Sequence, residues 1–255
     1  MLNLDAYLDR LGLRGEKLPP TRATIRRLQE AHLFNIPFEN LDLVWKRHIQ
    51  LDEQRLFNKI VGNRRGGFCY ELNGLMAAIL RQLGFEANLV AAAVANDEGV
   101  YGLDAAHACL RVALQEPLLM DVGFGRCFMR PLELKANLVQ HDGRDDYRLL
   151  QQGNLWVLQC RSDDGDVWKD YYRFTEEPWS LTDFQDMCDY QQTSPKSYFA
   201  GRTICSIATE TGRTTLTADS LILTEGDRRQ EMTFSDQAKF EQHLRTIFGI
   251  ARPSS

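Results

Sequence analysis

The hydrophobic pattern of the chain changes its period near residue 85, and this change constrains the fold more than any other feature. Before it, apolar residues recur at helical spacing, with the strongest stripe over 69–83 and a terminating Gly84. After it, short apolar or alternating runs between turn signals predict antiparallel strands. A block of helices followed by a block of strands is typical of an α+β protein.

The pattern divides the chain into three regions. Residues 1–84 are predicted to form a helical bundle, 85–178 an antiparallel barrel or curled sheet, and 179–255 a mixed α/β unit. In the last region Ser235 is expected to cap an amphipathic helix that ends at Gly249. The predicted strands cover 85–95, 108–114, 118–122, 147–150, 155–160, 167–174, 203–209, 214–218, 220–224 and 230–234.

Charge, hydropathy and cysteine spacing exclude several classes of protein. A net charge of −5 is unlike that of a nucleic-acid binder, which usually carries a basic stripe. No apolar run approaches the roughly 20 residues that span a bilayer, and no signal peptide is evident. The six cysteines form no C-x-x-C pair, so reduced thiols without a metal are predicted. We therefore expect a cytoplasmic protein with no nucleic-acid, membrane or metal partner.

Cys69 is the candidate nucleophile. It stands in the run 65–73 (RGGFCYELN), where the chain is predicted to enter a helix. Gly66 and Gly67 remove side-chain bulk beside it and permit unusual backbone angles. The partial positive charge of a helix N-terminus favours a thiolate over a thiol.

His107 and Asp121 are the candidate partners of this cysteine. A cysteine nucleophile needs a base within hydrogen-bond reach, and the base needs an acceptor that orients it. His107 lies at the start of a predicted strand among small residues, which leave space for another element to approach the ring. Asp121 ends the next apolar strand, where burying it unpaired would be costly. Two neighbouring antiparallel strands would bring the imidazole and the carboxylate together.

Four sequence blocks, in order, resemble the arylamine N-acetyltransferase family. They are 37–41 (PFENL), 65–73 (RGGFCYELN), 121–125 (DVGFG) and 194–199 (SPKSYF), and the resemblance covers nearly the whole chain. It implies a helical bundle, a β-barrel and an α/β lid around a core like that of papain and the transglutaminases. It also implies that Cys69, His107 and Asp121 form a catalytic triad.

The resemblance further implies ping-pong acetyl transfer. Acetyl-CoA would acetylate Cys69, and an arylamine, arylhydrazine or hydrazide would then take the acetyl group. Phe38, Phe124 and Phe199 are implied to line the acceptor pocket, where an aromatic amine could stack on their rings. Gly123 and Gly125 are expected to form a turn whose backbone faces the pantetheine arm or pyrophosphate of coenzyme A.

The family pattern also suggests structural roles and a source. It suggests that Arg10 pairs with Glu39, and that Arg65, Glu71 and Asn73 brace the site. A eukaryote-like insertion between barrel and lid is absent, which favours a bacterial source.

Three other functions stay open at this point. One is an amide synthase that acts on a thioester-bound polyketide with the same triad and a wider acceptor cleft. Another is a Cys-triad hydrolase of transglutaminase or papain type, with water or protein as acceptor. The third is a non-enzymatic scaffold, which the intact Cys-His-Asp set disfavours.

Overall fold

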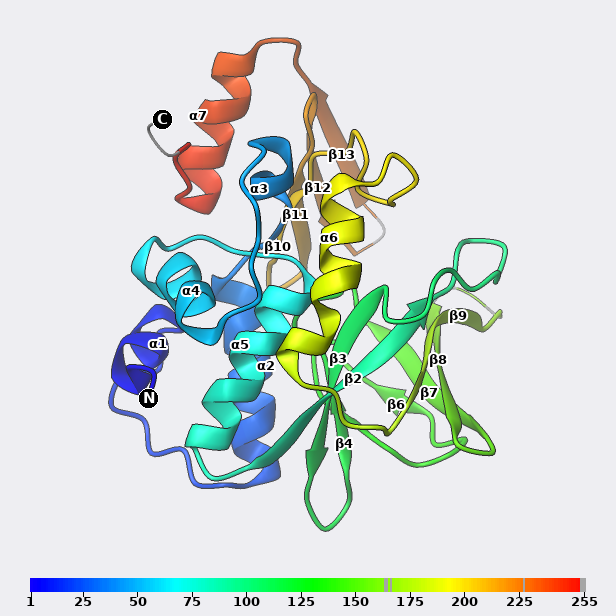
Figure 1. Ribbon diagram of the computed structural model, residues 1–255. Helices are drawn as coiled ribbons and strands as arrows, with labels where there is room; N and C mark the ends of the chain where they lie inside the picture. Colours follow the sequence, from blue (N-terminus) through cyan, green and yellow to red (C-terminus); the bar gives the residue numbers. More distant parts are fainter. Residues whose placement is uncertain (163–164, 166, 227, 253–255) are drawn as a thin grey trace.

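The computed structural model describes residues 1–162, 165, 167–226 and 228–252. Helices of the N-terminal region pack beside a curled sheet. A second sheet and the last helix form the upper part of the molecule in the view of Figure 1. The predicted α+β class is confirmed. Within the described part of the chain, no helix is long and apolar enough to cross a membrane.

The N-terminal region is built around one central helix. Its elements are α1 (Leu4–Arg10), α2 (Arg22–Asn35), α3 (Leu41–Val44), α4 (Glu53–Phe57) with a following π-helical turn (Asn58–Gly62), and α5 (Cys69–Gln82). The first twelve residues of α5, 69–80, are all buried, so polar as well as apolar faces of the helix are covered. Gly84 adopts φ +89° just beyond α5, as its predicted role of terminator requires.

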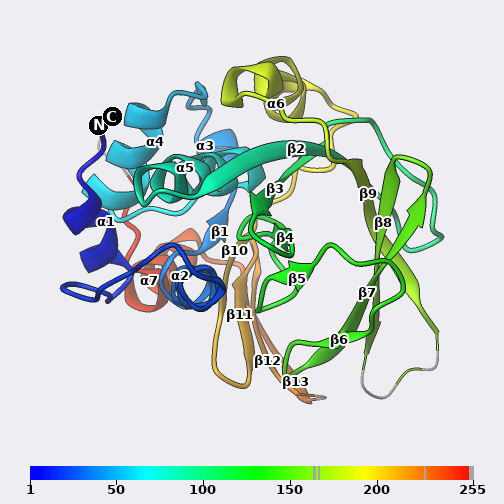
Figure 2. The same ribbon diagram turned by 90° about the horizontal axis from the view of Figure 1, so that it is seen from below.

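The middle of the chain forms an eight-stranded antiparallel sheet. Its strands are β2 (Glu86–Val94), β3 (His107–Ala113), β4 (Leu118–Met120), β5 (Leu132–Glu133), β6 (Gln140–His141), β7 (Asp145–Gln152), β8 (Leu155–Ser162) and β9 (Lys169–Thr175). The order β5-β4-β3-β2-β9-β8-β7-β6 curls until its two edges meet (Figure 2). There the Gln140 side chain hydrogen-bonds the backbone N–H and C=O of Glu133 at 2.8 and 3.1 Å. The predicted barrel is therefore nearly closed, and a side chain links its edges.

A second, five-stranded sheet, which we call the lid sheet, has the order β1-β10-β11-β12-β13. Its strands are β1 (Phe38–Glu39), β10 (Cys205–Ala208), β11 (Gly212–Leu216), β12 (Ser220–Glu225) and β13 (Arg228–Thr233). One face packs on α7 (Gln237–Phe248), and the barrel lies on the other side (Figure 2). The N-cap of α7 is Asp236, whose side chain accepts from the N–H of Ala238 at 2.9 Å. The predicted cap at Ser235 is therefore wrong by one residue.

Two short elements connect these parts. A 3-10 turn (Leu181–Phe184) leads into α6 (Gln185–Thr193), and Phe184 is buried in the same core as α5. Strand β1 pairs with β10, with Phe38 opposite Ser206, and also bridges to Gly67. Phe38 is thereby fixed between the lid sheet and the segment that carries Cys69.

Candidate active site

Cys69 is the first residue of α5 and is only 4% exposed. The preceding Phe68 has extended backbone angles, and its N–H donates to the Glu71 carboxylate at 3.2 Å. This bond closes the first turn around the cysteine. The free N–H groups of that turn supply the partial positive charge that stabilises a thiolate.

The structure brings His107 and Asp121 together. His107 opens β3, Asp121 directly follows β4, and these two strands are antiparallel neighbours. Nε2 of His107 donates to Oδ2 of Asp121 at 2.7 Å. Both side chains are almost completely buried. Because Asp121 occupies Nε2, the imidazole has Nδ1 left for the thiol of Cys69.

Asn73, one turn into α5, links the helix that begins at Cys69 to both strands. Its Nδ2 donates to the carbonyl of Ala108 at 2.7 Å and to Oδ1 of Asp121 at 2.9 Å. Its Oδ1 accepts from the N–H of Val122 at 3.0 Å. These bonds set the distance between Cys69 and the His107–Asp121 pair, which gives the suggested bracing role of Asn73 a geometric basis.

The histidine is held in its charged form. Burial alone would lower the pKa of His107, but the Asp121 carboxylate and the contact with Cys69 raise it to about 10. A raised pKa keeps the imidazolium populated through neutral pH and releases its proton only as the pH approaches that value.

We expect NMR titration of the imidazole to show this shift directly. The His107 resonances should stay in the protonated position from pH 6 to about 8.5 and move near pH 10. In Asp121→Asn the counter-charge is gone while burial remains, so the midpoint should fall below the ordinary value of about 6.5. His32 is the internal reference, because burial and then Arg10 lower its pKa to about 3, so it stays neutral throughout. A wild-type midpoint near 6.5 for His107 would contradict this account.

Aromatic rings enclose the histidine. The rings of Phe124 and Tyr172 lie 5.1 and 5.2 Å from that of His107, and Phe124 also stacks on Tyr171 at 5.6 Å. Such rings exclude water and attract a cation through their faces. Sequence reasoning missed Tyr172, because nothing in a run of alternating strand residues distinguishes a ring beside an imidazole from an ordinary core ring.

The three predicted pocket phenylalanines are all half-buried and come from three different parts of the chain. The Phe199 ring lies 6.3 Å from that of Phe38 and 5.9 Å from that of Phe68, next to Cys69. Phe199 also borders a cavity of about 290 Å³ between α3 and α6. Phe38 and Phe199 thus lie together on the lid side, while Phe124 lies on the barrel side against His107.

Comparison with known proteins identifies the family. A family profile described as N-acetyltransferase matches residues 21–253. The arylamine N-acetyltransferase of Mycolicibacterium smegmatis is 33% identical over 260 residues, which are 98% of this chain and 92% of the relative. The chain belongs to the arylamine N-acetyltransferase family. The family predicted from the motif blocks is therefore confirmed.

Solved structures of other arylamine N-acetyltransferases share the fold. That from Salmonella typhimurium superimposes with a TM-score of 0.91 at 31% identity, covering 98% of this chain and 92% of that one. That from Mycobacterium marinum in complex with CoA gives a TM-score of 0.87 at 30% identity, covering 97% and 93%. The arrangement of helices, barrel and lid is thus that of the family.

The glycine-rich turn after Asp121 approaches Cys69 closely. A Cβ on Gly123 would lie 2.7 Å from Cα of Cys69 and 2.7 Å from Nδ2 of Asn73. Gly125 has φ +87°, and a Cβ there would lie 3.9 Å from the Phe38 ring. Only glycine at position 123 lets this turn pack against the start of α5. This packing role is separate from the predicted role of Gly123 in binding coenzyme A.

Gly123→Ala is expected to lower kcat/KM for acetyl transfer about 100-fold, because the added methyl must push the turn away from Cys69 by a distance near 1 Å. Gly62→Ala is the matched control, because a Cβ at Gly62 meets nothing within 4 Å. Steady-state kinetics of the two folded variants make the comparison. Wild-type activity in Gly123→Ala would show that the close approach is unimportant.

The two glycines before Cys69 act through space and not through unusual angles. Neither has a positive φ, so that part of the prediction is wrong. A Cβ on Gly66 would lie 1.9 Å from the carbonyl oxygen of Pro37, and one on Gly67 would lie 2.8 Å from the Glu71 carboxylate. Positions 66 and 67 need glycine because Pro37 and Glu71 lie too close to leave room for a Cβ atom.

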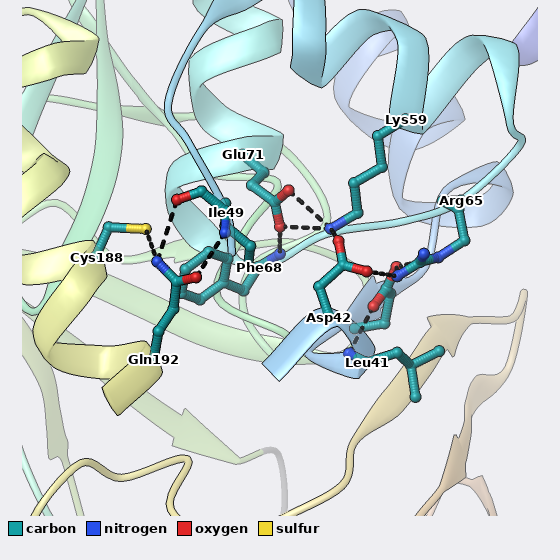
Figure 3. Close-up of polar contacts among 10 residues, drawn as sticks. Leu41, Asp42, Ile49, Lys59, Arg65, Phe68, Glu71, Cys188 and Gln192 are labelled. Atoms are coloured by element: carbon teal, nitrogen blue, oxygen red, sulfur yellow. Dashed lines mark hydrogen bonds and ion pairs between the residues drawn. The ribbon is translucent and has the colours of Figure 1, made fainter. Parts of the chain in front are cut away.

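A buried network of charges supports the same segment (Figure 3). Lys59 lies 2.7 Å from Glu71 and 2.8 Å from Asp42, and Arg65 lies 2.7 Å from Glu39 and 3.1 Å from Asp42. Removing one member of such a network leaves an uncompensated buried charge, at a cost of about 3–5 kcal/mol. The bracing suggested for Arg65 and Glu71 therefore has a clear physical basis.

The suggested pairing of Arg10 with Glu39 is wrong. Arg10 donates instead to the backbone oxygens of Ile60 and Asn35, and Glu39 is paired with Arg65.

All six cysteine thiols are free. In the part of the chain that the structure describes, no three His, Cys, Asp or Glu side chains are grouped so that they could hold a metal ion.

Proposed function

We propose that the protein transfers an acetyl group from acetyl-CoA to the nitrogen of an arylamine, arylhydrazine or hydrazide, through an acetyl thioester on Cys69. One observation carries the proposal: in a chain of this family, the nucleophile's helix begins beside a buried, charge-paired His107 and Asp121. A relative has been solved in complex with CoA, which supports the choice of donor.

In the first half-reaction the Cys69 thiolate attacks the acetyl carbonyl carbon of the donor. A new C–S bond forms, the thioester bond of acetyl-CoA breaks, and coenzyme A leaves with the electron pair. His107, protonated because Asp121 holds its charge, stabilises the thiolate before attack and can protonate the departing sulfur. Backbone N–H groups at the start of α5 are available to the developing oxyanion.

In the second half-reaction the acceptor amine attacks the acetyl-Cys69 carbonyl. His107, now neutral, takes the proton from the nitrogen, and Cys69 leaves again as a thiolate. Asp121 stabilises the imidazolium that forms and fixes the ring's orientation. We propose Phe38, Phe124 and Phe199 as the walls against which the acceptor ring packs.

The remaining features of the function are also proposals. Gly123 and Gly125 are proposed to offer their backbone to the donor, because they belong to the turn that follows Asp121 and lies close to Cys69 and to the Phe38 ring. We further propose a bacterial protein that acts in the cytoplasm on small molecules, without a metal, nucleic-acid or membrane partner. The net charge of −5 and the similarity to bacterial relatives support this setting.

Two-substrate kinetics test the proposed function. With acetyl-CoA and aniline both varied, double-reciprocal plots should give parallel lines, because coenzyme A leaves before the amine binds. Intersecting lines would show that both substrates bind together and would contradict the thioester route. Consumption of acetyl-CoA at the same rate without any amine would point to a hydrolase, and activity with only a carrier-bound thioester to an amide synthase.

A further inference from the structure

The lid sheet presents two chemically different faces. Cys205 and Ile207 on β10 belong to the apolar cluster formed with α7. Because side chains alternate along a strand, Ser206 faces the opposite way, toward the barrel. Residues opposite each other in an antiparallel pair share a face, so Phe38, which is paired with Ser206, lies on this second face. Arg213 on β11 lies on this second face too. Its partner on β10 is Ala208, which is two positions from Ser206 and therefore points the same way.

Arg213 is a half-buried cation that has no counter-charge among the described residues. Its Nη1 donates to Oγ of Ser206 at 2.9 Å, beside the position that Phe38 occupies on the neighbouring strand. Among the residues that the structure describes, no carboxylate lies within ion-pair distance of this guanidinium. A guanidinium has five N–H donors, so most of those on Arg213 remain available. Burial, followed by the charges of Arg144 and Arg126, lowers its pKa to about 10.

The two neighbouring arginines, Arg144 and Arg126, have partners within the protein. Arg144 donates to the backbone carbonyls of Thr209, Glu210 and Gly212. Arg126 lies 3.9 Å from the Asp145 carboxylate. Three guanidinium groups thus meet at the junction of barrel and lid sheet, and the described contacts supply one carboxylate to Arg126 and none to Arg213.

We propose that Arg213 forms an anion-binding subsite of the substrate cleft, at the barrel–lid junction next to Phe38. Its ligand is a carboxylate on the ring of an aromatic acceptor or a phosphate of the donor, since a planar guanidinium fork matches both groups. A cation withdrawn this far from water is normally paired, and here a substrate supplies the missing partner. The identity of the ligands rests on the proposed acetyl transfer, whereas the subsite itself rests on the geometry.

Calorimetric binding tests the subsite without requiring turnover, so its failure and failure of the proposed function are distinguishable. The probes are two matched pairs: 4-aminobenzoate with uncharged 4-aminobenzamide, and coenzyme A with uncharged pantetheine. In Arg213→Gln the anionic member of one pair should bind about ten- to a hundredfold more weakly, and its uncharged partner should bind unchanged. The pair that responds names the source of the anion.

Two further variants keep the result interpretable. Arg213→Lys retains the charge but loses the fork, so its binding should be intermediate. Arg245→Gln on the exposed side of α7 makes the same change in net charge away from the junction and should leave all four affinities unchanged. If both anions bind Arg213→Gln as tightly as wild type, or if an uncharged partner weakens equally, the subsite does not exist. The same holds if Arg245→Gln reproduces the loss.

Discussion

Cys69→Ser is expected to lower acetyl transfer to aniline by about 10⁶-fold, the scale on which removing the nucleophile of a triad acts. A serine hydroxyl is not ionised by a neighbouring imidazolium as a thiol is, so the helix N-terminus and His107 have no anion to stabilise. The side chain is nearly isosteric and 4% exposed, so the fold should persist. Single-turnover rates with acetyl-CoA and aniline measure the loss, and thermal unfolding checks the fold.

Cys205→Ala is the matched control for that variant. Cys205 is a fully buried thiol of the lid core packed near α7, away from the triad. Its removal should cost some stability but leave kcat close to that of wild type. Substantial turnover in Cys69→Ser, or an equal loss in Cys205→Ala, would remove Cys69 from the mechanism.

Asp121→Asn is expected to lower kcat about 10⁴-fold, the size of effect seen when a triad acid becomes an amide. The Oδ1 of asparagine can still accept from Asn73 and Gly123, so the architecture should be kept. The amide nitrogen, however, faces Nε2 of His107 where a carboxylate oxygen stood. The buried imidazolium loses its counter-charge, so the protonated form of His107 is no longer favoured.

Asp142→Asn offers a matched comparison within the barrel. Asp142 is also a buried carboxylate, and it accepts from the N–H groups of Met129, Arg144 and Asp145. The change should destabilise the protein by about 1–3 kcal/mol, because one N–H loses its acceptor, without a comparable loss of kcat. If Asp142→Asn lowered kcat as strongly as Asp121→Asn, the effect of Asp121 would be one of folding and not of charge on His107.

Those parts of the fold that depend on local sequence pattern are predictable from the sequence. The apolar stripe over 69–83 and Gly84 define α5, and a glycine-flanked cysteine at the start of that stripe predicts its place at a helix N-terminus. The adjacency of His107 and Asp121 follows because strands consecutive along the chain usually pair.

Those parts of the structure that depend on contacts between distant segments are not predictable from local sequence pattern. Strand β1 is only two residues long and exists because β10 and Gly67 bind it from either side. Glu39 pairs with Arg65 and not with Arg10. The segment before Cys69 hydrogen-bonds to β1, and this brings the Arg65 guanidinium to the Glu39 carboxylate. The close approach of Gly123 to Cys69 and the packing of the Tyr172 ring against His107 are likewise contacts between residues far apart in the sequence.

The central claim is that Cys69 itself carries the acetyl group between donor and acceptor. Incubation with acetyl-CoA and no amine, followed by intact-protein and peptide mass spectrometry, tests it most directly. The account predicts a mass increase of one acetyl group located on Cys69, which disappears on addition of aniline as acetanilide forms. Acetanilide formation under conditions in which Cys69 never becomes acetylated would contradict it.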